Sequence, residues 1–459
     1  MALDDIGTSN PSNGAARRIA VVGTGISGLS AAWLMARRHD VTVYEAAERA
    51  GGHSCTMHAP DGRAVDIGFI VFNEPNYPNL TALLRHLGVA SRPTVMSFAV
   101  SLDRGRLEYN GTDLAGLFAQ RRNLLRPRFL RMVRDVLRFY RTAPGHISAL
   151  WDTLEPLGSY LDRNGYSEAF QHDHLLPMAA AIWSTPCAEM RDHPAAAFLR
   201  FCDNHGLLQV NDRPEWRTVV GGSQSYVARL EAALERRILT GRGVTGIARD
   251  EAGVTIRDVT GASSRFDAVL IASHAHQALA MLDTPTDDEQ ALLGAFRPSP
   301  NRVVLHTDAS LMPRRKKAWA SWNYLGTTSA TGAPDMAMPC VSYWMNRLQG
   351  IAGPDLFVTL NPPVQPRSGT VIHSQDFNHP MFDGAAIEAQ RRLWSLQGVQ
   401  RTWFAGAWFG AGFHEDGLQA GLAAAEEIGG VRRPWSVSDE SGRIHLPPAA
   451  CRRVPVSTP

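Results

Sequence analysis

The sequence is poor in cysteine and lysine and has no long apolar run. Its 459 residues include five cysteines without any C-x-x-C pair. This fits neither a disulfide framework nor a zinc ribbon, so we expect reduced thiols and no metal site. The longest strongly apolar stretches, such as 175–183, fall far short of the roughly 18 to 20 residues needed to cross a bilayer.

No charge of one sign dominates the chain. It has 46 basic and 44 acidic residues, a formal net charge of +2, which excludes the overall positive charge of a dedicated nucleic-acid binder. Residues 1–17 lack the basic start and apolar stretch of a secretory signal. We therefore expect a disordered leader over 1–17 and a cytoplasmic protein that can lie on the inner face of the membrane.

A βαβ unit follows this leader. Residues 18–22 and 41–45 have the pattern of buried parallel strands, and 29–36 that of a helix rich in small residues. The turn between them has G-x-G-x-x-G spacing, which lets the backbone approach a pyrophosphate at the helix N-terminus. Glu45 ends the second strand, where a carboxylate can bind both ribose hydroxyls. The residues of the turn that are expected to bind the cofactor are Gly23, Gly25, Ile26, Ser27 and Gly28.

A glycine doublet after Glu45 separates this unit from a simple glycine turn. With Arg49, Gly51 and Gly52 in place, 18–52 resembles the FAD-binding signature of the amine oxidase and phytoene desaturase superfamily. The resemblance implies FAD rather than NAD, with these three residues around the pyrophosphate. His53 stands next, where many members have arginine, so its role there is open.

Later segments extend the resemblance. The stretch 402–421 is similar to the C-terminal flavin motif of the superfamily, which implies that Gly406, Asp416, Gly417 and Leu418 approach the flavin, and a helix is expected over 418–428. Val244 matches the strand whose backbone meets the adenine. Gly68 and Phe69 match the turn that passes the flavin ring. An ordinary strand-loop-helix, or a core strand at 66–70, is the structural alternative.

Two departures from the amine oxidases bear on chemistry. No cysteine lies near 406–417, which implies non-covalent FAD. His414 stands where monoamine oxidases place a tyrosine of their amine cage, so the cage is incomplete and His414 becomes the candidate substrate-facing catalytic residue. Segments 68–79 and 216–222 resemble a bacterial subgroup of NAD/FAD-binding, amine-oxidase-like proteins linked with cyclopropane-fatty-acid-type lipid modification.

These patterns predict an α/β fold: a doubly wound, Rossmann-like FAD-binding domain with an interleaved α+β substrate domain. The FAD-binding domain takes 18–80, 215–290 and 396–430. The substrate domain takes a mostly helical, membrane-facing lobe over 81–214, and 291–395, which contains a sheet. The tail 431–459 is expected to be irregular.

Five arginines recur on one face of an expected helix that starts at Pro127. They can meet anionic phospholipid or form the solvated face of a helix packed on the core. The two lysines of the chain, Lys316 and Lys317, are expected to be solvated. The five arginines are Arg128, Arg131, Arg134, Arg138 and Arg141.

The sequence thus predicts an FAD-dependent oxidoreductase of dehydrogenase or desaturase type, which transfers a hydride equivalent from an apolar substrate, such as a membrane lipid acyl chain, to flavin N5. The alternatives are an amine or amino acid oxidase that releases hydrogen peroxide, and a non-catalytic flavin- or lipid-binding protein. We expect a small-molecule or lipid substrate and no nucleic acid. The motifs leave the electron acceptor, oxygen or a quinone among others, and the oligomeric state open.

Overall fold

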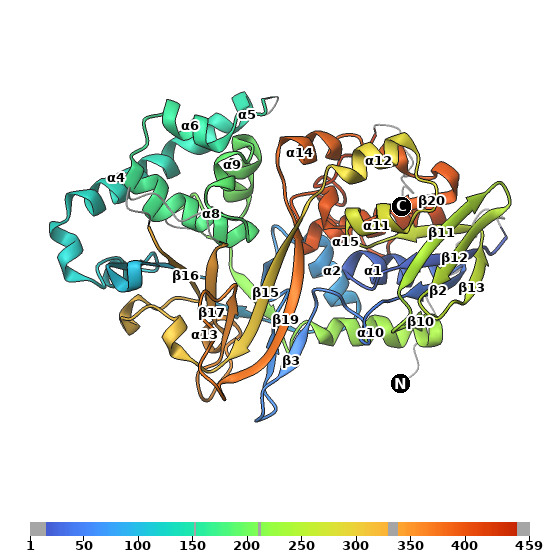
Figure 1. The fold of residues 1–459 in the computed structure, drawn as a ribbon, viewed down its shortest axis with the longest axis horizontal. Helices are drawn as coiled ribbons and strands as arrows, with labels where there is room; N and C mark the ends of the chain where they lie inside the picture. Colours follow the sequence, from blue (N-terminus) through green and yellow to red (C-terminus); the bar gives the residue numbers. More distant parts are fainter. Residues whose placement is uncertain (1–14, 151–152, 210–212, 329–337, 448–459) are drawn as a thin grey trace.

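A computed structural model describes residues 15–150, 153–209, 213–328 and 338–447. The predicted leader 1–17 lies largely outside this part, as does the end of the tail. Figure 1 shows a parallel sheet at one end of the molecule, a helical lobe at the other, and a second large sheet between them. The predicted α/β class is confirmed. Within the described residues, no helix is both long enough and apolar enough to span a membrane.

The parallel sheet is the centre of the nucleotide-binding part. Its strand order is β10-β2-β1-β14-β20, with all neighbouring strands parallel, so that chain segments more than 200 residues apart lie side by side. The predicted strand 18–22 is confirmed in full. The strands are β1 (Arg18–Val22), β2 (Asp40–Tyr44), β10 (Ile238–Leu239), β14 (Ala268–Ile271) and β20 (Thr402–Phe404).

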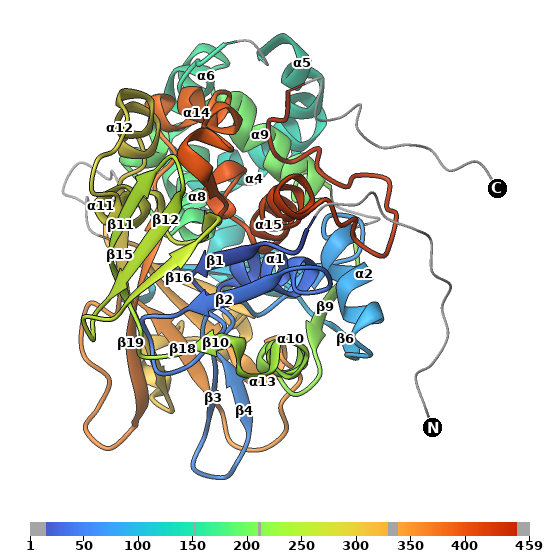
Figure 2. The ribbon, with the colours of Figure 1, turned by 90° about the vertical axis from the view of Figure 1, so that its right-hand side faces the viewer.

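Two helices bring their N-termini to this sheet. Helix α1 (Ile26–Met35) follows β1 and is buried along its whole length, because its small and apolar residues pack on every side. Helix α15 (His414–Gly429) follows β20 and packs directly against α1. Figure 2 shows the two helices next to each other beside the sheet.

The second sheet has seven strands in the order β19-β15-β18-β17-β16-β7-β8. Strand β7 pairs in parallel with β16, whereas all other neighbouring strands of this sheet pair antiparallel. The strands are β7 (Phe98–Leu102), β8 (Leu107–Asn110), β15 (Pro298–His306), β16 (Trp322–Gly326), β17 (Cys340–Trp344), β18 (Phe357–Leu360) and β19 (Val371–Pro380).

Smaller sheets and helices complete the two parts. Strands β11 (Val244–Asp250), β12 (Gly253–Asp258) and β13 (Ser263–Phe266) form an antiparallel sheet, β3 (Thr56–His58) pairs with β4 (Ala64–Asp66), and β9 (Trp216–Val219) lies between β5 (Phe72–Asn73) and β6 (Ser91–Thr94). The helices outside the lobe are α2 (Pro78–His86), α10 (Gln224–Leu234), α11 (Ala275–Met281), α12 (Asp287–Gly294), α13 (Met345–Leu348) and α14 (Gly384–Gln390).

The helical lobe covers 114–204, and Figure 1 places it at the end of the molecule opposite β1 and β2. Its buried aromatic side chains, Phe139, Tyr160, Phe170 and Phe198 among them, supply the apolar area that holds its short helices together. The helices are α3 (Leu114–Leu117), α4 (Pro127–Thr142), α5 (Ile147–Leu150), α6 (Leu157–Arg163), α7 (Glu168–Phe170), α8 (Leu176–Trp183) and α9 (Ala195–Asn204).

Two expectations from the pattern are wrong. Residues 91–110 were expected to be helical but form β6, β7 and β8, because pairing with distant β9 and β16 decides their conformation. Helix α15 begins at His414 rather than after Gly417. There Asp416 accepts a hydrogen bond from the Phe413 N–H at 2.7 Å and caps the helix start.

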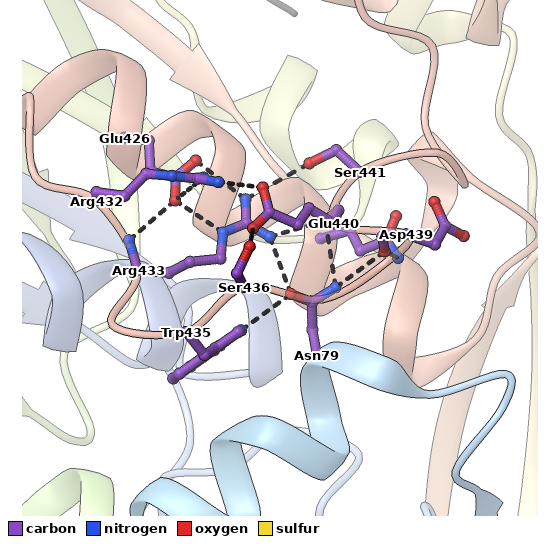
Figure 3. A network of polar contacts seen from close by, with 10 residues as sticks. Asn79, Glu426, Arg432, Arg433, Trp435, Ser436, Asp439, Glu440 and Ser441 are labelled. Atoms are coloured by element: carbon purple, nitrogen blue, oxygen red, sulfur yellow. Dashed lines mark hydrogen bonds and ion pairs between the residues drawn. The ribbon is translucent and has the colours of Figure 1, made fainter. Parts of the chain in front are cut away.

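Residues 431–447 form no helix or strand but are tied firmly to the body. Figure 3 shows the network that holds them, in which the buried Arg433 joins Glu426 of α15 to Asn79 of α2. The indole of Trp435 donates to the same Asn79 side chain and stacks on Trp33 of α1, with ring centroids 6.0 Å apart. The segment therefore acts as a strap over α1, α2 and α15.

Candidate FAD site and the cavity beside it

The first glycine turn leaves the start of α1 open. Gly23 has φ +101° and its N–H donates to Tyr44 O at 2.8 Å, which holds β1 against β2. A Cβ at Gly28 would lie 1.9 Å from Gly23 O, so only glycine fits there. A Cβ at Gly25, in contrast, would meet no protein atom within 4 Å. The chain thus keeps free space where the unpaired N–H groups of α1 point, as a pyrophosphate requires.

Glu45 lies beside this turn at the end of β2. Its carboxylate accepts hydrogen bonds from the N–H groups of Thr24, at 2.9 Å, and Ala47, at 2.8 Å. Its own N–H donates to Leu239 O at 3.0 Å, which places the segment leading to Val244 next to it. The structure therefore brings Glu45 and the start of β11 together, as the ribose and adenine assignment requires.

The glycine doublet folds back onto the first turn. The Gly51 N–H donates to Thr24 O at 3.1 Å, and a Cβ at Gly52 would lie 3.0 Å from the Cα of Gly25. Arg49 crosses this loop and donates to Gly52 O at 3.0 Å. The two glycine motifs form one cradle, although 22 residues lie between Gly28 and Gly51.

Each residue of the His-Glu-Asp-Gly segment at the start of α15 has a different partner. Glu415 is buried and accepts from the N–H groups of Asn79 and Leu80, both at 3.0 Å, so it caps α2. Asp416 pairs with Arg443 of the strap, with Nε and Oδ1 2.6 Å apart. A Cβ at Gly417 would lie 2.9 Å from the Ser27 hydroxyl of α1. The segment fixes the helix start on three sides.

The positions of Asp416 and Arg49 refine their predicted roles. Asp416 was expected to approach the flavin, but its side chain is occupied by Arg443 and by the Phe413 N–H. Asp416 therefore holds the start of α15 in place. Arg49 likewise donates to carbonyls of its own loop, those of Gly52, Ala50 and Ser54. Gly406 sits directly under Trp408, because a Cβ there would meet the indole Nε1 at 2.2 Å. Leu418 is fully buried.

His414 contacts the predicted Phe69 and also Tyr226, which the sequence did not indicate. Its Nε2 lies 2.7 Å from the hydroxyl of Tyr226, which is also hydrogen-bonded to Ser54. Its ring stacks on Phe69, with centroids 3.9 Å apart. Burial lowers the pKa of His414 to about 3, so the imidazole is neutral at neutral pH. His414 is thus a fixed, uncharged hydrogen-bonding group that joins α15 to Phe69 and to Tyr226 of α10.

A cavity of about 60 Å³ lies between the glycine-motif loops and the face of the seven-stranded sheet. His53 and Gly68 contribute from one side, and Tyr343 from β17 contributes from the other. The ring of Tyr343 is one of two aromatic side chains, with Phe377, that line the cavity. The other lining residues are Ile67, Ile70, Ser184, Val303, Val358, Leu360, Phe377 and His379.

His53 stands where the cradle meets this cavity. Its ring lies 4.7 Å from Phe377 and 5.4 Å from His379, and its buried Nε2 has no hydrogen-bond partner in the protein. Burial, followed by the nearby His379 and His274, lowers its pKa well below the usual value. A buried unpaired ring nitrogen is costly unless a bound group satisfies it, so His53 is available to a cofactor.

Sequence reasoning missed Tyr226, His274 and His379. Tyr226 follows the Gly221-Gly222 turn, a pattern that also fits an ordinary helix cap. The two histidines have no motif of their own, because they reach the site from α11 and β19 only after both sheets have formed. Lys316 and Lys317 are exposed, as expected for a solvated charge run.

The residues present fit a flavin dinucleotide. The chain provides an open helix start, a second glycine loop packed on it, a carboxylate at the end of β2 and an unpaired imidazole beside an apolar cavity. Comparison with known families agrees. The model of the flavin containing amine oxidoreductases matches residues 26–353.

The chain belongs to this family. Its cofactor is FAD, and the prediction of an amine-oxidase-like FAD oxidoreductase is confirmed at the level of the family. Known relatives include a protein of Mycobacterium tuberculosis named as a flavin-containing monoamine oxidase, 28% identical over 61% of this chain and 62% of its own length. The chain therefore spans less than two thirds of that relative.

Solved structures share the fold over almost their whole length. Cyclohexylamine oxidase from Brevibacterium oxydans has a TM-score of 0.65 at 16% identity and covers 90% of this chain and 99% of its own. A fatty acid isomerase from P. acnes that produces conjugated linoleic acid (CLA) has a TM-score of 0.63 at 17% identity, over 91% and 99%. The same architecture thus occurs with amine and with fatty acid substrates.

Proposed function

We propose that this protein is an FAD-dependent dehydrogenase of desaturase type that acts on an apolar substrate, the acyl chain of a membrane lipid. The observation that carries the proposal is the lining of the cavity. Its described residues include no carboxylate, lysine or arginine. Its two histidines are His53 and His379, and burial lowers the pKa of His379 to about 4. An uncharged wall suits a hydrocarbon, whereas it leaves a substrate ammonium without a partner.

When bound, the flavin accepts the hydride equivalent at N5. The chain's own contribution is to orient the substrate carbon and to exclude water. Branched and aromatic side chains of β15, β17, β18 and β19 form the apolar wall of the cavity. The Tyr226 hydroxyl and the neutral His414 form one hydrogen-bonded pair, which positions a hydroxyl proton between them while the pair stays uncharged.

The alternative is an amine or amino acid oxidase that releases hydrogen peroxide. The relative named as a monoamine oxidase and the cyclohexylamine oxidase structure favour it. The cavity weighs against it, because the buried acidic residues near the site, Asp66, Glu415 and Asp416, are all engaged inside the protein. The third hypothesis is a non-catalytic flavin- or lipid-binding protein. It predicts that the bound FAD is not reduced by any of these substrates.

Anaerobic mixing separates the three. The purified yellow protein is mixed without oxygen with phospholipid micelles or with a panel of amines and amino acids, and flavin absorbance is followed. We expect bleaching by phospholipid together with acyl chains that have lost two hydrogens, measured by mass spectrometry. Bleaching by amines alone, with peroxide on admission of air, would establish the oxidase; bleaching by neither would leave the binding protein.

A further inference from the structure

One face of the helical lobe combines exposed leucines with arginines. Twelve large apolar side chains are exposed among the described residues, and five of them lie within 114–137. Leu125 is 87% exposed and Leu114 is 74% exposed, which is unusual for residues that gain free energy by burial. We call this face the arginine–leucine surface. Its leucines are Leu114, Leu124, Leu125, Leu130 and Leu137.

The surrounding charge is strongly positive. Residues 103–141 and 314–317 carry fourteen arginines and lysines against four acidic residues, an excess of ten in a chain whose total is +2. Two of the acidic residues, Glu108 and Asp135, are buried. The exposed cations of the surface are Arg104, Arg106, Arg121, Arg122, Arg128, Arg131, Arg134, Arg141, Arg314, Arg315, Lys316 and Lys317.

Hydrogen bonds gather part of these cations at one place. Arg122 and Arg126 both donate to Arg106 O, at 2.6 and 3.0 Å, and Arg315 donates to the neighbouring Gly105 O at 3.3 Å. Partial burial, and then the like charges of Arg122, Arg106 and Arg315, lower the pKa of Arg126. The positive charges are therefore close together. Asp103 and Glu108 pair with Arg106 and Arg315, whereas no described acidic residue pairs with Arg122 or Arg126.

Helix α4 continues the surface. Its inner face buries Phe129, Met132 and Phe139. Its outer face presents Leu130, Arg134, Leu137 and Arg141, spaced by four, three and four residues, so that they form one stripe along the helix.

The structure also separates the arginines expected at a membrane into two groups. Arg128 is held by Asp173 through two hydrogen bonds, at 2.7 and 3.0 Å. Arg138 lies over the Tyr166 ring and donates to Asn164 O. This leaves Arg131, Arg134 and Arg141 directed outward.

We propose that the arginine–leucine surface docks on a bilayer containing anionic phospholipid, with its leucines in the acyl boundary and its arginines and lysines at the headgroups. Both kinds of side chain are satisfied only there. A nucleic acid offers phosphates to the cations but no apolar medium for side chains as exposed as Leu125. The proposal does not rest on catalysis, and it holds for any reaction at the flavin.

Vesicle sedimentation of the full FAD-containing protein tests the proposal. We expect the protein to sediment with vesicles of phosphatidylglycerol and phosphatidylcholine in equal parts, and little of it to sediment with phosphatidylcholine alone. Sedimentation with the anionic vesicles should fall markedly between about 0.05 and 0.5 M salt, because the Debye length shortens. Leu124→Ser with Leu125→Ser, and separately Arg131→Glu with Arg141→Glu, should each weaken binding at least about tenfold.

Matched controls use exposed residues on other elements. Val259→Ser with Val364→Ser, and Arg229→Glu with Arg236→Glu, should bind vesicles within about twofold of the parent, and all variants should keep their FAD absorbance. Equal sedimentation of the leucine variant and the parent would overturn the proposal. So would salt-dependent binding to duplex DNA or RNA with no affinity for the vesicles.

Discussion

Single residues at the start of α15 connect parts of the chain that are far apart in sequence. Within four consecutive positions, His414 meets Tyr226, Glu415 caps α2, Asp416 binds Arg443, and Gly417 allows α15 to approach α1. Removing a partner of a buried carboxylate leaves an uncompensated charge, so these contacts are sensitive to change. The most selective test at this scale is at the start of the other helix, α1, where Gly25 lies.

Gly25→Ala probes the open space directly. The residue has φ −60° and its Cβ would meet nothing within 4 Å, so the substitution should leave the folded apoprotein and its Tm unchanged. If the pyrophosphate occupies that space, the added methyl group should weaken FAD binding at least about tenfold. Gly111→Ala, which also meets no atom, is the matched control for FAD titration. Unchanged affinity in Gly25→Ala would place the pyrophosphate elsewhere.

A second residue-scale prediction concerns His414. His414→Asn and Tyr226→Phe each break the 2.7 Å hydrogen bond but avoid the glycine cradle. Both variants should bind FAD normally and slow anaerobic flavin reduction by about 100-fold or more, the lower end of the usual range for a positioned acid–base group. Stopped-flow absorbance measures the rate. If reduction proceeds at the parent rate in both variants, the pair has no part in the chemistry.

At the scale of elements, the strap 431–447 holds α15 in place. Arg443 lies between Asp416 of α15 and the Asn76 carbonyl, to which it donates at 2.8 Å, and Arg433 joins α15 to α2 (Figure 3). Nearby positive charge of Arg443 opposes the rise in the pKa of Asp416 that burial causes. The start of α15 is therefore supported by residues that follow the family match in sequence.

Breaking this support should be costly. Arg443→Gln leaves the fully buried Asp416 unpaired, and we expect a loss of about 3 kcal/mol in the free energy of unfolding. Arg432→Gln is the matched control, because Arg432 is 41% exposed and its ion pairs are worth about 1 kcal/mol or less. Chemical denaturation followed by tryptophan fluorescence measures both. If both variants lost the same free energy of unfolding, the strap would not depend on the buried Asp416–Arg443 pair.

At the scale of the whole molecule, histidines are buried in both parts of the fold. Burial lowers the pKa of His174, His193, His306 and His379 to about 4. In the unfolded chain a histidine titrates near 6.5, so between pH 6.5 and 4 the unfolded state binds more protons than the folded state. The folded state therefore loses stability as the pH falls through this window.

We expect the Tm of the protein to fall by several degrees between pH 7 and pH 5, measured by scanning calorimetry. Asp66 opposes this trend in part, because burial raises its pKa to about 6 and its protonation favours the folded state below that value. Burial also raises the pKa values of Glu415 and Asp416, which act in the same direction as Asp66, but these carboxyl groups are outnumbered by the buried histidines. A Tm that stays constant or rises over this range would contradict the neutral, buried state of the histidines.

The sequence by itself determined the local half of the site. The strand 18–22, the glycine turn, Glu45 and the doublet lie within 35 residues, and their conformations follow from glycine's freedom and from the apolar pattern of buried strands. Only the tertiary structure decided the rest. Strands at 91–110 exist because distant β9 and β16 pair with them, and the meeting of His53, His379 and Tyr343 around one cavity depends on how two sheets pack. Such contacts join residues hundreds of positions apart and carry no local signal, which is why the cofactor could be inferred from motifs while the shape of the cavity could not.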